Sequence, residues 1–495
     1  MASNSRIQSL DPVQAVTSGS MQVLSAIGDP LYRVTVEGTI EPRLAAAMPI
    51  LSPDGLVARI PLRQNVRFHD DTRFDAEAMV FSMRRFMQIG KLSYLISDRV
   101  KAVRASGPYE LELELKQPFS PLARMLSAVL LTPVSPQAYR EYRDRPLNDR
   151  FVGTGPYQVS FFSDQQQRLI PFNRYWGSNP VNSGLDLVTL SNSTALYGAL
   201  NSGEVDVLLS SGLAGEHKRA LHQQARADKL REGAGPAKVI VYLTLLTDQP
   251  KLNDPILRQA ISLSLDRRTI KERVYFNLQP ALRQLVPPSL PGSEPGAWPR
   301  YNPDSARELY RQAGYCDGER LDLPLTFRSN VPSDRLLALT WKAQIARDLG
   351  DCVNLEVTGM ESTTAIAQLD KGIFPMILLD WLGDYPAADN YLTPLLGCDE
   401  VKDGSCISGN SALSGSFWTA PGIDQQLRRS TELGGQQSIQ LLQRIQRRVA
   451  SASPYIPVSL QAPVAWSQLQ ISTPRFDGSG RVMLDQLRRQ AKATP

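Results

Sequence analysis

The sequence predicts an α/β protein built from more than one domain. At 495 residues the chain is too long for a single hydrophobic core. Short, mainly apolar runs such as VDVLL, which are typical of buried strands, alternate with segments of helical periodicity. The order strand, helix, strand over residues 185–209 is that of a βαβ unit with a right-handed crossover. The composition, 42% hydrophobic and 21% charged, is that of an ordinary globular protein.

The first third of the chain reads as a compact α+β unit that ends near residue 150. Residues 31–62 contain three strand-like pieces separated by turns. A helix is expected from Asp75, a good N-cap, because apolar residues follow at helical spacing up to Phe86. LELEL then alternates with period two, as a half-buried strand does.

The rest of the chain alternates strands and helices. VGTGPYQV opens the next unit, where Gly153 and Gly155 permit close backbone approach. Strands are then expected at 185–190, 205–209, 239–247, 323–329, 352–358 and 455–460. Helices are expected over STALYGALNSGE, DPILRQAISLSLDRRTI, NPDSARELYRQAGY, LLALTWKAQIARDLG and SIQLLQRIQRRVA. In the third of these helices Asp304 or Ser305 is the expected cap, and Gly314 ends it.

Charge and hydropathy exclude two classes of function. The net charge of +5 is small for this length and no run of basic residues occurs, so nucleic-acid binding is not expected. No stretch approaches the roughly 18 apolar residues of a membrane span. MASNSRIQSLDP has no basic region followed by an apolar one, so a secretory signal is either lacking or already removed.

The four cysteines all follow residue 315. Sequence alone does not choose among their three pairings; we favour Cys398–Cys406, which would close a polar loop, together with Cys316–Cys352. Reduced buried thiols remain an alternative, and a zinc site is disfavoured because no C-x-x-C spacing occurs. Disulfides would place the protein in an oxidising compartment.

Seven segments together resemble family 5 of the solute-binding proteins of ABC importers, the peptide and nickel class. In chain order they are IEPRLA, VRFHDDTRFDAEAMVFSMRR, VGTGPYQV, ALNSGEVDVL, NDPILRQAISLSLDRRTI, YNPDSARELYRQAGY and DWLGDYPAADNY. They spread over most of the chain.

The resemblance implies a two-lobed periplasmic-binding-protein (flytrap) fold with an additional inserted α+β domain. The first lobe would comprise residues 1–36, 152–248 and 455–495, the inserted domain 37–151, and the second lobe 249–454. The ligand would lie between the lobes, which close by a hinge motion. The protein would be an exported monomer, periplasmic or lipid-anchored, that delivers short peptides to a membrane permease. It would not be an enzyme and would need no cofactor.

In peptide-binding members of the family, an Asp in the W-x-x-D-Y stretch anchors the α-ammonium of the peptide. The resemblance assigns this role to Asp384, with Trp381 and Tyr385 as walls or stacking surfaces. The alternative is a capped turn and core packing at a strand end. Asp380 and Asp389 are expected to be loop carboxylates.

Three departures from the family pattern bear on the ligand. Leu378 stands where oligopeptide-binding members carry an Arg for the peptide carboxylate; Arg328 is a candidate replacement, with an ordinary surface arginine as the alternative. Asp29 and Leu31 fill ligand-contacting positions of the N-terminal strand. Between them Pro30 lacks a backbone N–H, so one donor to an extended peptide is lost.

Other hypotheses follow from the same residues. Nickel ligation is disfavoured, since His69 lies in the FHDD block, which is structural by resemblance, and His217 and His222 lie on an expected exposed helix. An oligosaccharide or a metal chelate are alternative ligands, a sugar stacking on Trp381, Tyr385 and Trp176. A hydrolase using the paired aspartates near Asp384 lacks any supporting motif, and a sensor cannot be separated from a transporter by sequence.

Overall fold

The computed structural model describes residues 1–490. It divides into two compact units. The first contains residues 1–236, the short segment 384–386 and the tail from residue 463, and the second contains residues 237–383 and 387–462. The internal boundaries therefore differ from the expected ones near 248 and 454. The expected inserted domain, 37–151, stays within the first unit. Each unit is described by itself.

The first unit is organised on a seven-stranded sheet with the order β12-β20-β11-β1-β10-β9-β8. Strand β1 pairs in parallel with both β10 and β11, and α5 connects these two strands, so the predicted βαβ unit is present. The elements are β1 (Ala2–Ser3), β8 (Tyr157–Phe162), β9 (Gln166–Pro171), β10 (Leu185–Thr189), α5 (Ser193–Ser202), β11 (Val207–Leu209), α6 (Gly215–Arg226), β12 (Arg231–Ala234), β20 (Val464–Ser467) and η3 (Leu484–Gln486).

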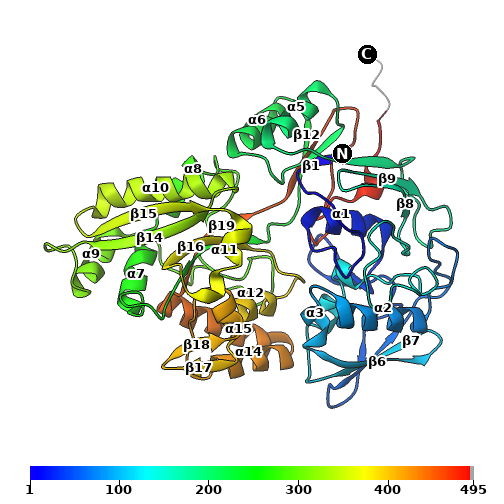
Figure 1. Ribbon diagram of the computed structural model, residues 1–495, viewed down its shortest axis with the longest axis horizontal. Coiled ribbons are helices and arrows are strands. Elements are labelled where there is room, and N and C mark those ends of the chain that lie inside the picture. The colour runs from blue at the N-terminus through cyan, green and yellow to red at the C-terminus, as the bar shows by residue number, and fades with distance from the viewer. Residues whose placement is uncertain (491–495) are drawn as a thin grey trace. The chain divides into compact units, whose positions relative to one another are not determined.

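A second, antiparallel sheet with the order β4-β5-β7-β6 forms the α+β part of this unit, and α2 lies alongside β6 and β7 (Figure 1). Asp75 caps α2 as predicted, accepting a hydrogen bond from the Ala78 backbone N–H. The remaining elements are α1 (Ser18–Ile27), β2 (Tyr32–Val34), β3 (Ile40–Pro42), β4 (Ile50–Leu51), β5 (Val57–Pro61), α2 (Ala76–Ile89), α3 (Tyr94–Ser97), β6 (Val100–Gly107), β7 (Glu110–Leu115), α4 (Leu122–Met125) and η1 (Val129–Leu131).

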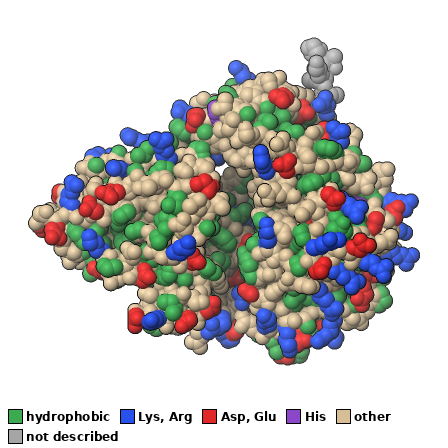
Figure 2. All heavy atoms as spheres, viewed as in Figure 1, with side chains coloured by type: hydrophobic (Ala, Val, Ile, Leu, Met, Phe, Trp, Pro, Cys, Tyr) green, Lys and Arg blue, Asp and Glu red, His purple; other side chains and the backbone are tan. Residues whose placement is uncertain are grey.

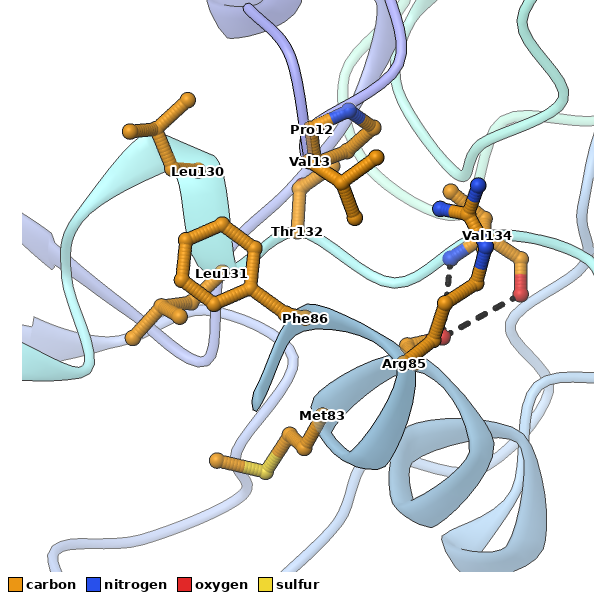
Figure 3. Close-up of a pocket in the computed structure, with 10 residues that line it drawn as sticks. Pro12, Val13, Met83, Arg85, Phe86, Leu130, Leu131, Thr132 and Val134 are labelled. Carbon is orange, nitrogen blue, oxygen red and sulfur yellow. Dashed lines mark hydrogen bonds between the residues drawn. The ribbon is translucent and has the colours of Figure 1, made fainter. Parts of the chain in front are cut away.

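Helix α2 is joined to the N-terminal segment by a buried ion pair. Figure 3 shows side chains that line a small cavity beside this pair; they are Met83, Arg85 and Phe86 of α2 with Pro12, Val13, Leu130, Leu131, Thr132 and Val134. The volume of the cavity is about 10 Å³. That volume holds roughly one water molecule. Arg85 donates to both carboxylate oxygens of Asp11, from Nη1 at 2.7 Å and from Nη2 at 2.6 Å. This cavity is a packing feature and is too small for a solute.

The VGTGPY segment packs against the end of α1 through its glycines. A Cβ on Gly155 would lie 2.3 Å from the backbone carbon of Ile27, so this close approach requires glycine. His69 holds the same segment: its Nδ1 accepts from the Gly153 N–H, and its Nε2 donates to the Gly155 carbonyl. Burial lowers the pKa of His69 to about 4. A neutral imidazole thus fastens the backbone here.

The second unit is built on a five-stranded sheet with the order β15-β14-β16-β13-β19, in which β14, β15 and β16 are parallel. Side chains alternate between two cores: Leu243 and Leu378 face one, while Tyr242 and Leu379 face the other. Helix α10 runs alongside β14 and β15 (Figure 1). The sheet is therefore buried on both faces, as its apolar runs predict.

The elements of the second unit are β13 (Val239–Leu245), α7 (Pro255–Leu263), α8 (Arg267–Arg273), α9 (Pro303–Gln312), β14 (Leu321–Arg328), α10 (Pro332–Leu349), β15 (Val353–Met360), α11 (Ser362–Ile366), η2 (Leu369–Lys371), β16 (Met376–Trp381), α12 (Asp389–Leu396), β17 (Glu400–Lys402), β18 (Ser405–Ser408), α13 (Asn410–Leu413), α14 (Ile423–Glu432), α15 (Gly435–Ala452) and β19 (Tyr455–Gln461). Both favoured disulfides, Cys316–Cys352 and Cys398–Cys406, are present.

The structure divides one expected helical region and corrects the cap of another. The helix-rich stretch expected over 254–270 forms two helices, because the Asp266 side chain caps a new helix by accepting from the Arg268 and Thr269 N–H groups. Helix α9 is capped by Asn302, neither by Asp304 nor by Ser305, since Pro303 occupies its first turn. Gly314 follows the end of this helix at φ 90°.

Candidate functional site

The W-x-x-D-Y stretch lies where the buried strand β16 ends. Trp381 is the last residue of the strand, and its indole N–H donates to the Asn390 carbonyl at 2.7 Å. The ring is partly buried against one core of the second unit. Trp381 is thereby held in place by the start of α12, which provides a rigid aromatic surface.

Residues 384–386 belong to the first unit, and each of the three contacts a different part of that unit. The Tyr94 phenol of α3 donates to Oδ2 of Asp384 at 3.1 Å, and the Tyr385 ring meets the Phe119 ring edge-to-face with centroids 6.5 Å apart. Arg124 donates to the Pro386 carbonyl at 3.1 Å. Partial burial raises the pKa of Tyr94 and the Asp384 charge raises it further, so the phenol stays a neutral donor at physiological pH.

Asp380 and Asp389 are not loop carboxylates, so that expectation was wrong. Asp389 is the first residue of α12 and is buried. A carboxylate in the first turn of a helix is favoured by the helix dipole. Asp380 lies within β16 and pairs with Arg328. The strand β16 extends to Trp381 and the helix α12 begins at Asp389, so the loop between them is shorter than expected and contains neither carboxylate.

Arg328 is the last residue of β14 and is only 6% exposed, so it is not a surface arginine. Its Nη1 and Nη2 donate to the two oxygens of Asp380 at 2.8 and 3.1 Å, and its Nε donates to Asp334 at 2.7 Å. Burial alone would lower the pKa of Arg328, but the two carboxylates outweigh it and the net shift is upward. Burial raises the pKa of Asp334 to about 6 against the opposing effect of Arg328.

The carboxylate of Asp29 accepts hydrogen bonds from side chains of the first unit. It accepts from Arg43 at 2.8 Å and from the Trp176 indole at 3.0 Å, with Tyr175 and Thr154 as further donors. The guanidinium groups of Arg43 and Arg63 lie 5.1 and 4.6 Å from the Trp176 ring. These contacts occupy Trp176, which weakens its candidacy as a sugar-stacking surface.

Leu31 is buried, and its carbonyl accepts from the backbone N–H groups of Arg43 at 2.8 Å and Ala45 at 3.0 Å. Both lone pairs of that carbonyl are therefore used within the chain. The predicted site residues thus fall into separate groups of direct contacts. Asp384 contacts Tyr94, and Tyr385 contacts Phe119. Arg328 is paired with Asp334 and Asp380, and Asp29 accepts from Trp176.

The histidines of α6 are engaged individually. Nδ1 of His217 lies 2.6 Å from the Ser193 hydroxyl and the ring stacks on Tyr197, while His222 pairs with Glu232 at 3.0 Å. Within residues 1–490 no three His, Cys, Asp or Glu side chains are grouped so that they could hold a metal ion. In the same range, no helix combines the length and apolar character needed to cross a membrane.

Sequence reasoning missed Tyr94, Asp334 and the pairing of Asp380. Tyr94 lies in KLSYLIS, a segment with no motif, so nothing local marked it. Asp334 follows Arg328 by six residues across a strand-to-helix turn, and that spacing could have suggested a pair because the first turn of a helix favours a carboxylate.

Comparison with known proteins decides the family. The model for the bacterial extracellular solute-binding proteins, family 5, matches residues 39–403. The chain belongs to this family. It is 24% identical to the di/tripeptide-binding protein 2 of Pseudomonas aeruginosa, over 91% of this chain and 87% of the relative. It is also 24% identical to the glutathione-binding protein GsiB of Salmonella paratyphi A, over 94% and 89%.

The fold is shared with solved structures of the family. NikA from Brucella suis, in complex with Fe(III)-EDTA, aligns with a TM-score of 0.86 at 18% identity, covering 99% of both chains. The two-lobed periplasmic-binding-protein fold expected of this family 5 chain is therefore confirmed.

Figure 2 shows Lys and Arg side chains interspersed with Asp and Glu over the face in view. This mixture agrees with the small net charge of the chain, +5. The visible face of this family 5 protein thus has no large field of one sign.

Proposed function

We propose that this family 5 protein is the solute-binding component of an ABC importer. Its ligands are short peptides with a free amine, and Asp384 binds the ammonium group. The observation that carries the proposal is the Asp384 carboxylate, which is half-buried beside Tyr385 and accepts a hydrogen bond from a neutral phenol. A carboxylate in such surroundings gains strongly from a charge-assisted bond to an ammonium.

The aromatic neighbours fit the same role. Trp381 is fixed by its contact to Asn390 and is only partly buried, so it offers preorganised apolar surface to a ligand. Tyr385 packs on Phe119 and is 6% exposed, so it supports the segment around Asp384. The names of the relatives, di/tripeptide-binding and glutathione-binding, agree with a small ligand that carries an amine.

The cell compartment is part of the proposal. Two disulfides favour an oxidising, extracytoplasmic location. There the protein, periplasmic or lipid-anchored, would act as a monomer that hands its ligand to a membrane permease.

The test is thermal unfolding of the protein with di- to pentapeptides, glutathione, oligosaccharides and nickel or iron chelates. A ligand at 100 times its dissociation constant adds about 2.7 kcal/mol to the unfolding free energy, which raises the midpoint visibly. We expect free-amine peptides to stabilise the protein and N-acetylated versions to fail. Stabilisation by sugars or chelates alone would overturn the peptide proposal.

The matching variant is Asp384→Asn, which keeps the size of the side chain and removes its charge. Affinity for free-amine peptides should fall by roughly 30-fold or more, since truncating one partner of a buried charge pair costs about 2–5 kcal/mol. Asp322→Asn is the control, because Asp322 is an exposed carboxylate at the start of β14. Equal affinity of Asp384→Asn and the wild type for free-amine peptides would remove Asp384 from the proposal.

A further inference from the structure

The ion cluster Arg328–Asp334–Asp380 lies at the carboxyl edge of the sheet of the second unit. Arg328 ends β14 and Asp380 is the penultimate residue of the parallel neighbour β16. Asp334 sits in the first turn of α10, directly after β14. In α/β sheets, ligands bind outside the carboxyl ends of the strands. Asp380 also precedes Asp384 by four residues, in the segment that carries the proposed ammonium site.

The two carboxylates of the cluster are not equivalent. The Asp334 side chain is 2% exposed and that of Arg328 is 8% exposed, whereas Asp380 is 36% exposed. Asp334 alone balances the charge of the guanidinium. Asp380 is therefore a second anion, open to solvent, that leaves the cluster with a net charge of −1.

Asp380 binds the two terminal nitrogens of Arg328, which are the atoms best placed to bind the carboxylate of a ligand. The two terminal nitrogens of an arginine form a planar fork that matches a carboxylate, and Asp380 fills it with two hydrogen bonds. Asp334 binds only Nε, on the side of the guanidinium. The fork is thus occupied by a carboxylate of the chain itself, held in the geometry that a ligand carboxylate would adopt.

We infer that Asp380 is a specificity-determining residue: it occupies the Arg328 fork in place of a ligand carboxylate, so the protein does not require a free carboxyl group in its ligand. Peptide amides are bound as well as free acids, or better. The half-exposed Asp380 carboxylate favours cationic groups near this edge. This inference rests on the proposed peptide-binding function and names the ligand class of that site.

The test compares a tripeptide with free amine and free carboxyl, Ala-Ala-Ala, with its C-terminal amide, by calorimetric titration. Wild-type protein should bind the amide at least as tightly as the acid. In Asp380→Asn a neutral amide with one acceptor oxygen replaces the bidentate carboxylate, so a ligand carboxylate can displace it from the fork. The ratio of acid to amide affinity should then rise by about tenfold, the size expected for one charged hydrogen-bonded contact. The amide introduced by Asp380→Asn keeps one acceptor for Arg328, and Asp380→Ser gives a second variant; thermal unfolding establishes that each is folded.

Two controls separate the fork from simple loss of charge. Asp322→Asn makes the same charge change at the opposite end of β14 and should leave the ratio unchanged. In the double variant Asp380→Asn with Arg328→Lys, the cation remains but the fork is gone, so the gain for the acid should disappear.

The outcomes distinguish the two proposals. If wild type binds both tripeptides and Asp380→Asn leaves the ratio unchanged, the role of Asp380 is overturned while the peptide-binding function stands. Wild-type preference for the acid by about tenfold or more overturns it as well. If wild type binds no free-amine peptide of the panel, both proposals fail together.

Discussion

Two arginine–carboxylate clusters, one in each unit, differ in balance and in access to solvent. In the first unit Arg85 and Asp11 form a one-to-one pair that is almost fully buried. Arg85 also donates to the carbonyls of Tyr142 and Arg145, and Asp11 accepts from the Leu147 backbone N–H. In the second unit Arg328 is shared by two carboxylates, one of which is half-exposed.

This difference separates a structural cluster from one that is suited to binding. A buried pair with every donor and acceptor satisfied holds chain segments together but offers nothing to a ligand. In the Arg328 cluster there is one carboxylate more than the guanidinium balances, and Asp380 is partly exposed to solvent. Arg328 can therefore exchange Asp380 for a group of a ligand. Both use the same bidentate geometry, so the geometry by itself does not identify a binding site.

The largest expected effect is on the balanced pair. Replacing Arg85 by Met leaves Asp11 as a buried, uncompensated charge, which should cost about 3–5 kcal/mol of unfolding free energy in urea titrations. Arg168→Met is the control: Arg168 binds Asp186 bidentately on the surface, where solvent screens the pair, so this variant should lose far less stability than Arg85→Met. Equal losses in the two variants would contradict the importance of burial.

The pH dependence of stability should have opposite signs in the two units. His69 of the first unit has its pKa lowered from 6.5 to about 4, so its stabilisation is complete above pH 6.5 and is lost as the pH falls towards 4. Asp334 of the second unit has its pKa raised from 3.8 to about 6, so its contribution is complete below pH 3.8 and is lost as the pH rises through 6. Each shift corresponds to about 3 kcal/mol.

Urea unfolding between pH 4 and 7 separates the two contributions. Asp334→Asn should make stability rise more steeply with pH than in the wild type, and His69→Gln should make it rise less or fall. Identical slopes for wild type and Asp334→Asn would show that this carboxyl group does not titrate with a raised pKa.

The smallest expected effect on stability comes from replacing Asp380, the partly exposed carboxylate of the Arg328 cluster. Asp380→Asn should change the unfolding free energy by less than about 1 kcal/mol, because the side chain is 36% exposed and Arg328 keeps Asp334. A loss as large as that of Arg85→Met would make Asp380 a structural residue and remove the contrast between the clusters. Urea titration at constant pH measures both.

Much of the fold was predictable from local pattern. The cap at Asp75, the apolar runs of the second sheet and the glycine segment at 153–155 each reflect chemistry contained within a few residues. The cap at Asn302 was missed because several neighbouring polar residues could have capped the helix. Backbone geometry decided between them.

The sequence by itself determined the family, the α/β class and the location of the W-x-x-D-Y stretch, because strand and helix periodicities and ordered motifs are properties of the linear chain. Only the tertiary structure decided that Arg328 is buried, that Asp380 fills its fork, and that Tyr94 meets Asp384. Tyr94 and Asp384 are 290 residues apart in sequence. Contacts over such separations depend on how sheets and loops pack, which no local pattern encodes.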